Sequence, residues 1–438
     1  MDLELLIAAA TGTTAGILIG LLPGLGTTSL LLVCFPFLVK QSLIFCIVFY
    51  CVASSISQYF GSVTTLTFGI PGENTSLPLF SIRDKILESN RLNEIYYLCA
   101  FGSLIASLLS LVVLYFSIDF FLSNVFYLKS YFSLFFAIVG LFLCVLYSNN
   151  RIITSIILLL TGWFFGKIGY NEILNSNFMT FDNSYLYSGI PSLPAIMGIY
   201  ALPSLYFMTK RLKELKEIRN NSLVEFNMVN STFENLTTVF RSSLVGFVSG
   251  LIPYIGNSIS SNMAFNMEKK LKPNNYVAQA TASESANNSA NISVLVPLLF
   301  LGVAIVPSEF VLLEIIASSN SFINWKTIYS NFITILLILL VTNAFAFYIS
   351  WICLKGFNKF IARTASYLPI LIFGLVTSSI FYLGFNLNQG TFYLVVLFFF
   401  FSLGLLLSKL DLLPFTYAFL LQNNVEQLFY RFYQIYIL

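Results

Sequence analysis

The sequence predicts an all-α polytopic membrane protein made of two inverted-topology repeats with broken or re-entrant helices and about 10–13 membrane segments. Three observations predict this fold. Of 438 residues, 57% are hydrophobic and only 9% are charged, whereas soluble domains carry about 25% charged residues. A proline- and glycine-containing motif recurs inside apolar runs of both halves. The charges that flank the two copies differ in sign.

The apolar segments give the count of membrane spans, since one helical span needs about 20 apolar residues. They are 4–22, 25–38, 42–67, 95–122, 131–148, 152–168, 191–208, 242–266, 286–306, 327–353, 367–386 and 391–408. A last stretch, 412–438, contains Glu426 and Arg431 and either spans the membrane or lies in its interface. Helices are expected because lipid requires internally satisfied backbone groups and no alternating ten-residue strands occur.

Composition excludes several classes of protein. The N-terminus reads MDLELL, with two acidic residues and no basic region, so a cleaved signal peptide is not expected. Net charge is +3 and the basic residues are scattered, which gives no support for nucleic-acid binding. The chain has no histidine, and its six cysteines lie in or beside apolar runs without a CxxC pair. We therefore expect packing cysteines, no metal and no cofactor other than a coupling ion.

The repeat is visible in GILIGLLPGLGTT, 16–28, and GFVSGLIPYIGNS, 246–258. Four positions match at one offset: Gly16 with Gly246, Gly20 with Gly250, Pro23 with Pro253, and Gly26 with Gly256. A duplicated unit explains this match. The predicted division is 1–208 for the first transmembrane repeat, 209–239 for a cytoplasmic connector and 240–438 for the second transmembrane repeat.

The flanking charges predict how the two copies are inserted. Four basic residues bracket the second copy, Arg241, Lys269, Lys270 and Lys272. Segments that flank a membrane span on the cytoplasmic side are typically rich in Lys and Arg. If the second copy is a hairpin that enters and leaves the membrane on one side, that side is therefore the cytoplasm. Asp2, Glu4 and a single lysine, Lys40, bracket the first copy, which fits the opposite side. Opposite insertion of two similar units is the inverted repeat of many secondary transporters.

A break inside a spanning helix has a chemical use. A helix that stops at Pro23 and Gly24 and restarts at Gly26 exposes carbonyl groups at one end and N–H groups at the other, beside Thr27, Thr28 and Ser29. The N–H end suits an anion, and the carbonyls and hydroxyls suit a desolvated Na⁺. The second copy offers Pro253, Tyr254, Gly256, Asn257 and Ser258. A proline kink that only shapes packing is the alternative, and the repetition of the motif favours a site.

Two further stretches are polar where apolarity is expected. Residues 59–78 contain Ser62 and a second break followed by an acid and an amide, namely Pro71, Gly72, Glu73 and Asn74. Residues 280–297 contain Glu284 and the adjacent amides Asn287 and Asn288. A charge near the bilayer centre costs roughly 3 kcal/mol or more, so such groups usually face a cavity or a partner. The alternative is that both acids lie in loops at the water surface.

At these motifs the sequence resembles the large permease subunit of the tripartite tricarboxylate transporters, the TctA-type family. That family has a GxLPGLG segment, a Y-x-G-S stretch leading into IPGE, a second GxLPGxG segment, an E-x-ANN-A motif and an LIPLLxLGIPG run. The counterparts here are GLLPGLG at 20–26, YFGS at 59–62, IPGE at 70–73, GLIPYIG at 250–256, ESANNSA at 284–290 and LVPLLFLGVAIVP at 295–307. Six motifs in order span most of the chain.

The resemblance implies a function and partners. It implies an ion-transporter-superfamily-like fold in the bacterial inner membrane, a periplasmic solute-binding protein, and a small membrane subunit of about four helices. Uptake of a small carboxylate would be driven by Na⁺ or H⁺, which agrees with the absence of a GxxxxGK[ST] phosphate loop. Two departures stand out. Tyr254 replaces a glycine, and LGVAIV replaces LGIPG with its only proline at Pro307, so an altered substrate is expected.

The sequence therefore predicts a permease that imports di- or tricarboxylates, with its site between the broken segments and supported by the acidic and amide motifs. Two other classes stay open. A stand-alone ion-coupled transporter, exporter or channel would share the broken helices but need no binding protein. A membrane enzyme would need clustered acid and base groups, for which the chain offers little. Monomer and homodimer both stay open as oligomeric states.

Overall fold

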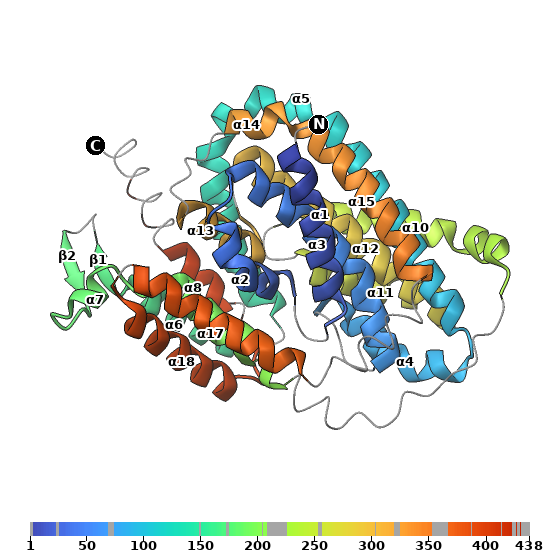
Figure 1. Cartoon of the computed structure of the whole chain (residues 1–438). Helices are drawn as coiled ribbons and strands as arrows, with labels where there is room; N and C mark the ends of the chain where they lie inside the picture. The colour runs from blue at the N-terminus through green and yellow to red at the C-terminus, as the bar shows by residue number, and fades with distance from the viewer. Residues whose placement is uncertain are drawn as a thin grey trace.

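The computed structural model describes most of the chain. The described residues are 3–22, 26–68, 74–148, 150–171, 175–203, 205–207, 226–252, 256–302, 304–318, 325–352, 367–386, 388–412, 414–422, 426 and 430. Helices dominate them, so the chain is an all-α membrane protein apart from one small hairpin (Figure 1).

The first half begins with a broken pair of helices. Its elements are α1 (Leu3–Gly20), α2 (Thr27–Leu38), α3 (Leu43–Phe68), the short helix η1 (Asn74–Ser76), α4 (Leu77–Glu88) and α5 (Leu92–Tyr147). The second half follows the same order. Its elements are α10 (Met228–Gly250), α11 (Gly256–Leu271), α12 (Tyr276–Val296), the π-helical turn η3 (Pro297–Leu301), α13 (Pro307–Ser318), α14 (Trp325–Ser330) and α15 (Phe332–Ile352).

The remaining elements form a second group of helices beside these two units (Figure 1). They are α6 (Ile152–Lys167), α7 (Ser184–Tyr187), α8 (Ser192–Ile196), the π-helical turn η2 (Met197–Ala201), α17 (Leu368–Asn386) and α18 (Gly390–Leu406). Buried Leu158, Ile199, Phe400 and Phe415 belong to one apolar cluster that joins α6, η2, α18 and residues 414–422. The strands β1 (Gly169–Asn171) and β2 (Ser176–Phe178) pair antiparallel, with Gly169 opposite Phe178.

Four helices in the described part of the chain are long and apolar enough to cross a membrane: Leu3–Gly20, Leu43–Leu66, Leu92–Ser117 and Phe332–Ile352. Shorter apolar helices, among them Thr27–Leu38, Ile152–Lys167 and Gly390–Leu406, accompany them. This confirms a multi-pass membrane protein, whereas the total of ten to thirteen segments stays a prediction.

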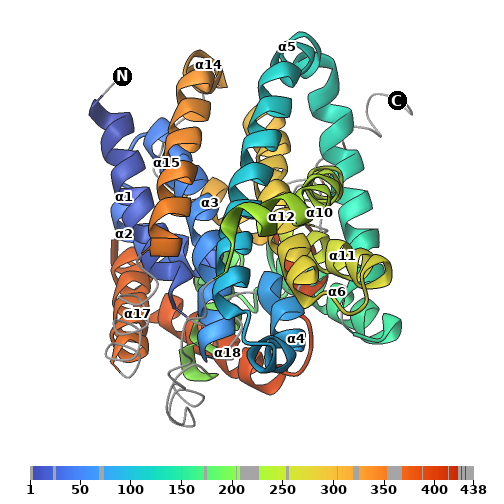
Figure 2. The same ribbon diagram turned by 90° about the vertical axis from the view of Figure 1, so that its right-hand side faces the viewer.

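Three elements differ from the sequence expectation. Segments 95–122 and 131–148 fall within one helical element, α5, which folds back at the top of Figure 2, so that the two segments are separate limbs without a non-helical loop between them. Helix α10 begins at Met228, inside the predicted connector, where the Asn227 side chain accepts a hydrogen bond from the Asn230 N–H and caps it. The β1–β2 hairpin was not expected, since its strands have only three residues each.

The repeated glycines pack one helix of each unit against its neighbour. A Cβ on Gly16 of α1 would lie 2.7 Å from the Ala53 carbonyl oxygen of α3, and one on Gly20 would lie 2.6 Å from that of Ser57. On α10, a Cβ on Gly246 would collide with the backbone of Ala286 in α12, and one on Gly250 would lie 2.7 Å from the Ala290 Cα. The matched glycines therefore have the same packing role in both halves.

Polar contacts join the two helices of each broken pair. Ser42, which follows α2, donates a hydrogen bond to the Glu4 carboxylate at the start of α1. In the second half, Glu268 of α11 is fully buried and accepts from Arg241 in the middle of α10, and its other oxygen is 3.6 Å from the Lys272 ammonium. Each pair is thus a hairpin, and the last turns of α11 lie beside the middle of α10.

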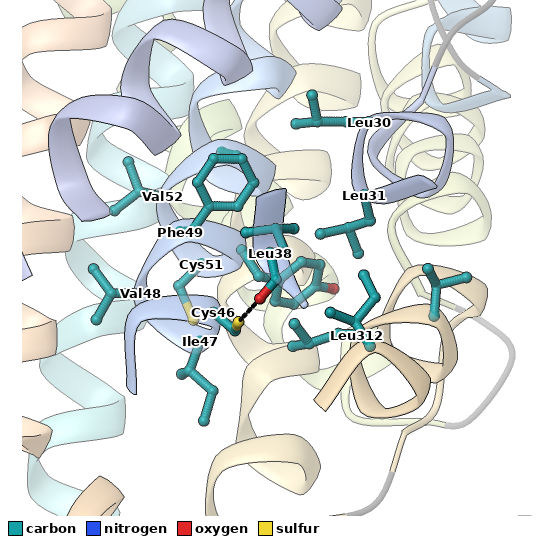
Figure 3. Close-up of a cluster of buried hydrophobic side chains, with 14 of the residues drawn as sticks. Leu30, Leu31, Leu38, Cys46, Ile47, Val48, Phe49, Cys51, Val52 and Leu312 are labelled. Carbon is teal, nitrogen blue, oxygen red and sulfur yellow. Dashed lines mark hydrogen bonds between the residues drawn. The ribbon is translucent and has the colours of Figure 1, made fainter. Parts of the chain in front are cut away.

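Helices of the first half pack against helices of the second half, and several of these contacts occur in matching pairs. Helix α5 lies against α12 and α15 against α3, and α5 and α15 also contact each other, beside the middle of the molecule where α3 and α12 lie (Figure 2). Helix α4 contacts α11 and α12, and α13 contacts α2 and α3 in the same way. Figure 3 shows the last of these contacts, where Leu312 of α13 meets Leu31 and Leu38 of α2 and residues of α3. The α5–α12 contact thus corresponds to the α15–α3 contact, and the contacts of α4 with α11 and α12 correspond to those of α13 with α2 and α3.

Candidate functional site

The centre of the molecule is polar. All residues of α12 from Val277 to Val296 are buried, among them Glu284, Asn287, Asn288 and Asn291. The middle of α3 is equally buried and contains Ser54, Ser55, Gln58, Tyr59 and Ser62. Polar side chains that face the interior of a helical membrane protein usually mark a path for substrate or ions. The crossing of α3 and α12 is therefore the candidate site.

Two reciprocal hydrogen bonds join these helices. Ser54 donates to the Asn291 amide oxygen at 2.7 Å. Gln58 accepts a hydrogen bond from the Asn287 amide nitrogen at 2.9 Å. Gln58 lies one turn after Ser54 on α3, and Asn287 lies one turn before Asn291 on α12. The two helices therefore run antiparallel. On α3, Ser54 and Gln58 come directly after the two residues that pack against the glycines of α1. On α12, Asn287 and Asn291 come directly after the two residues that pack against the glycines of α10.

The start of α11 reaches this crossing. Asn257, its second residue, donates from Nδ2 to the Asn291 amide oxygen at 2.9 Å. Gly256 opens the helix with φ of +45°, a conformation that glycine adopts without strain. The Asn291 oxygen thus accepts from α3 and α11 together, and the second broken segment is attached to the central pair of helices.

A second layer of amides lies outside the crossing. Asn343 of α15 accepts from Ser55 and from Tyr59, each at 3.0 Å. From α12, Asn288 donates from Nδ2 to Ser103 of α5 at 2.7 Å. These bonds fix the flanking helices α15 and α5 to α3 and α12 and hold the central side chains in place.

Three amide atoms near the crossing lack a hydrogen-bond partner within the described residues. They are Asn287 Oδ1, Asn288 Oδ1 and Asn291 Nδ2, and all three side chains are buried. A buried polar atom left unsatisfied costs about 1–3 kcal/mol, so such atoms need an explanation. The free donor on Asn291 suits a carboxylate, and the free acceptors on Asn287 and Asn288 suit a cation or a substrate hydroxyl group.

The first broken segment also presents an uncapped helix start. Gly26 precedes α2 in extended conformation and provides no side-chain cap, and Thr27 and Ser29 in the first turn are buried. Thr28 is half-buried. Four N–H groups at the start of any helix have no partner within it, and the helix dipole makes this end favourable for an anion. The segment therefore has the properties expected of an anion-binding helix end.

Apart from those at the starts of α2 and α11, the predicted site residues fall into three groups. The structure brings Asn257 and Asn287 to the crossing and Asn288 to the adjoining layer against α5, with Glu284 one turn before Asn288, whose amide donates to the Glu284 carbonyl oxygen at 3.1 Å. Ser62 donates only to the Tyr59 carbonyl oxygen within α3. Outside the described residues lie Pro23, Gly24, Pro71, Gly72, Glu73, Pro253 and Tyr254, and the side chains of Asn74 and Ser258 are not described either.

The sequence motifs did not single out several residues of the network. These are Ser54, Ser55, Gln58, Ser103, Asn291 and Asn343; Tyr59 lies in the YFGS motif but was not predicted as a site residue. The signal for some of them was present, because SSISQY in residues 54–59 interrupts a strongly apolar run. Asn343 stands alone between apolar residues and gave no pattern to recognise.

This geometry defines an all-helical membrane protein with broken helices beside a buried polar centre, the class to which secondary transporters belong. Residues 6–417 match the model of the tripartite tricarboxylate transporter TctA family. The chain therefore belongs to that family, which is a family of transporters and not of enzymes.

The chain is also similar to a protein of Agrobacterium vitis. The relative is an uncharacterized 52.8 kDa protein in the TAR-I ttuC' 3'region of Agrobacterium vitis, 23% identical over 301 residues. The match covers 67% of this chain and 59% of the relative, so the chain spans somewhat over half of that protein's length. No solved structure matches the chain.

Proposed function

We propose that this chain is the permease of a binding-protein-dependent secondary transporter that imports a small di- or tricarboxylate with Na⁺ or H⁺. The observation that carries the proposal is the Asn291 amide, whose oxygen is held by Ser54 and Asn257 while its buried Nδ2 has no partner among the described residues. A donor fixed in this way, beside the start of α11, matches the oxygen of a carboxylate.

The proposed path runs between two inverted repeats. The antiparallel bonds Ser54–Asn291 and Gln58–Asn287 support this arrangement, because exchanging the two halves converts one bond into the other. The matched glycine contacts of α1 with α3 and of α10 with α12 support it as well. Such a pair of units would rock about the central crossing and expose the site first to one side and then to the other.

The proposed partners follow from the family. They are a periplasmic solute-binding protein that delivers the carboxylate and a small membrane subunit, with all membrane parts in the bacterial inner membrane. The flanking Arg241, Lys269, Lys270 and Lys272 support a cytoplasmic position for the ends of the α10–α11 hairpin.

Uptake into lipid vesicles tests the proposal. The permease and the small subunit encoded with it are reconstituted together, and radiolabelled citrate or succinate is added with and without the soluble binding protein. We expect uptake only with the binding protein and only while an Na⁺ or H⁺ gradient is present. Uptake that is equally fast without the binding protein contradicts the tripartite function and favours a stand-alone transporter.

Two variants make the test specific for the site. Asn288→Ala removes a buried amide whose Oδ1 has no partner among the described residues and should lower uptake at least tenfold, since about 1.4 kcal/mol of lost interaction with the ligand corresponds to a factor of ten. The control is Asn230→Ala, which changes an exposed residue in the first turn of α10. Equal uptake by both variants, at equal amounts of inserted protein, contradicts the site.

A further inference from the structure

The loop between α12 and α13 contains a buried acid that the proposed site does not use. Glu309 is the third residue of α13, and its side chain is fully buried. The sequence here is LGVAIVPSE, which lacks the proline–glycine pair of the other breaks. Gly302 ends the preceding π-helical turn with φ of +66°, and residues 304–306 lead into α13.

The two oxygens of this carboxyl group have different surroundings. Oε2 accepts the Ile305 N–H at 2.7 Å and the Val306 N–H at 3.4 Å, so the side chain caps the loop before its own helix. Oε1 is buried and has no hydrogen-bond partner among the residues that the structure describes. An ionised carboxylate has about four acceptor sites, so the charged form leaves one oxygen without compensation.

The neighbouring groups do not neutralise a charge on Glu309. No lysine or arginine of the described residues lies within ion-pair distance of it. The titratable groups that interact with it electrostatically are Tyr50 and Cys51 of α3 and Tyr417 of residues 414–422. A buried charge without a partner is strongly unfavourable, and a proton on Oε1 removes this cost without any further ligand.

The Glu309 loop touches the second broken segment. A Cβ on Gly256 would lie 3.0 Å from Cγ1 of Val306, whose N–H faces Glu309. Gly256 precedes Asn257, which holds the Asn291 oxygen. On its other side, Ser308 shares a hydrogen bond of 3.0 Å with Tyr50 of α3. Since an ionised oxygen accepts hydrogen bonds more strongly than a neutral one, the charge of Glu309 changes how tightly Ile305 and Val306 are held to the start of α13, next to Gly256.

We propose that Glu309 carries the coupling proton of this transporter, an inference that rests on the proposed function. The proton binds to Oε1 from one side of the membrane and makes the carboxyl group neutral while Oε2 keeps its two N–H donors. Loss of that proton to the other side restores the anion and tightens the loop beside Gly256. Substrate at Asn291 and the proton at Glu309 are thereby linked through Val306 and the start of α11.

The test uses Glu309→Gln in the vesicles described above, with the small subunit and the binding protein present. Glutamine keeps an oxygen for the Ile305 and Val306 N–H groups but takes up no proton, so it imitates the neutral acid. The control is Glu314→Gln, which changes the other acid of α13 at an exposed position. Two rates are measured for each protein with radiolabelled citrate and succinate: exchange without a gradient, and accumulation driven by an inward H⁺ gradient.

We expect the exchange rate of Glu309→Gln to be within about twofold of the wild-type rate. Its H⁺-driven accumulation of substrate should be lower than that of wild type by about tenfold or more. Glu314→Gln should keep both. Infrared spectra of wild type should show a carboxylic acid C=O band that vanishes as the pH rises and is missing from Glu309→Gln. The proposal is overturned if Glu309→Gln accumulates substrate like wild type, or if it loses exchange together with accumulation, which would make Glu309 only a structural cap.

The same vesicles separate this proposal from the proposed function. Wild type that neither exchanges nor accumulates either carboxylate contradicts the proposed function itself. Wild type that exchanges substrate but accumulates it only on an Na⁺ gradient leaves the proposed function standing and overturns the role of Glu309.

Discussion

At the scale of single residues, Asn291 has the central position. Its oxygen accepts hydrogen bonds from Ser54 and Asn257, and its nitrogen is left for a ligand. Asn343 is a natural comparison, because its oxygen also accepts two bonds, from Ser55 and Tyr59, while its nitrogen donates to the Leu339 carbonyl oxygen at 2.7 Å. The two amides therefore differ chiefly in whether a donor remains available.

Replacing each amide by alanine separates binding from stability. Asn291→Ala leaves buried Ser54 and half-buried Asn257 without an acceptor, and Asn343→Ala leaves buried Ser55 and Tyr59 without one, so each should lower the free energy of unfolding by roughly 1–3 kcal/mol. Only Asn291→Ala should also lower carboxylate uptake by about tenfold or more beyond the loss of folded protein. Thermal unfolding in detergent and uptake per inserted molecule measure the two effects. Equal uptake by the two variants contradicts a ligand on Asn291.

The sequence pointed to part of this network for a physical reason. Glu284, Asn287 and Asn288 stand together in a polar cluster within an apolar context, and such a cluster is recognisable without a structure. Ser54, Gln58 and Asn343 could not be grouped with them, because their bonds join residues more than 200 positions apart in the chain. The pairing of these residues depends on the crossing of helices, which local sequence does not encode.

At the scale of helices, the glycines of α1 and α10 set the close approach to α3 and α12. Gly16→Ala and Gly246→Ala each place a Cβ against backbone that has no room to move, at Ala53 and Ala286 respectively. Both should reduce the yield and the thermal stability of the protein in detergent by a similar amount. Thermal unfolding monitored by fluorescence measures this.

Gly374→Ala in α17 is the matched control. A Cβ there meets nothing within 4 Å, and alanine favours a helix by up to about 1 kcal/mol over glycine. The control should therefore be as stable as wild type or more stable. Unchanged stability of Gly16→Ala or Gly246→Ala would show that the helices tolerate a wider separation than these contacts imply.

Helix ends were predictable where proline or glycine marks them and less so elsewhere. The starts of α2 and α11 follow directly from PGLG and PYIG. The break before α13 lacks such a pair, and there the Glu309 side chain supplies the cap from within the helix. A cap of this kind requires knowing that residues 304–306 leave the helix, which the apolar sequence LGVAIV does not reveal.

At the scale of the whole molecule, the two hairpins are expected to open to opposite sides of the membrane. Lys40 follows α2 and Lys270 ends α11, and both side chains are exposed. Lys40→Cys should react in intact cells with a maleimide that does not cross membranes. Lys270→Cys should react only after the membrane is permeabilised, because its hairpin is flanked by the basic residues typical of the cytoplasm. Labelling of both positions from the same side contradicts the inverted repeat.

The proposed transport function requires that a small carboxylate binds where α11 begins beside the α3–α12 crossing. Its most direct test is substrate protection of Asn257→Cys, a half-buried position at the start of α11, in vesicles that contain the permease and the small subunit, with the binding protein present. We expect citrate or succinate, whichever the wild type transports, to slow maleimide labelling at this position several-fold, at roughly the concentration that half-saturates uptake. Labelling of the exposed control Asn230→Cys should not change. If the transported carboxylate leaves the labelling of both positions unchanged, the substrate binds elsewhere and the proposed site is wrong.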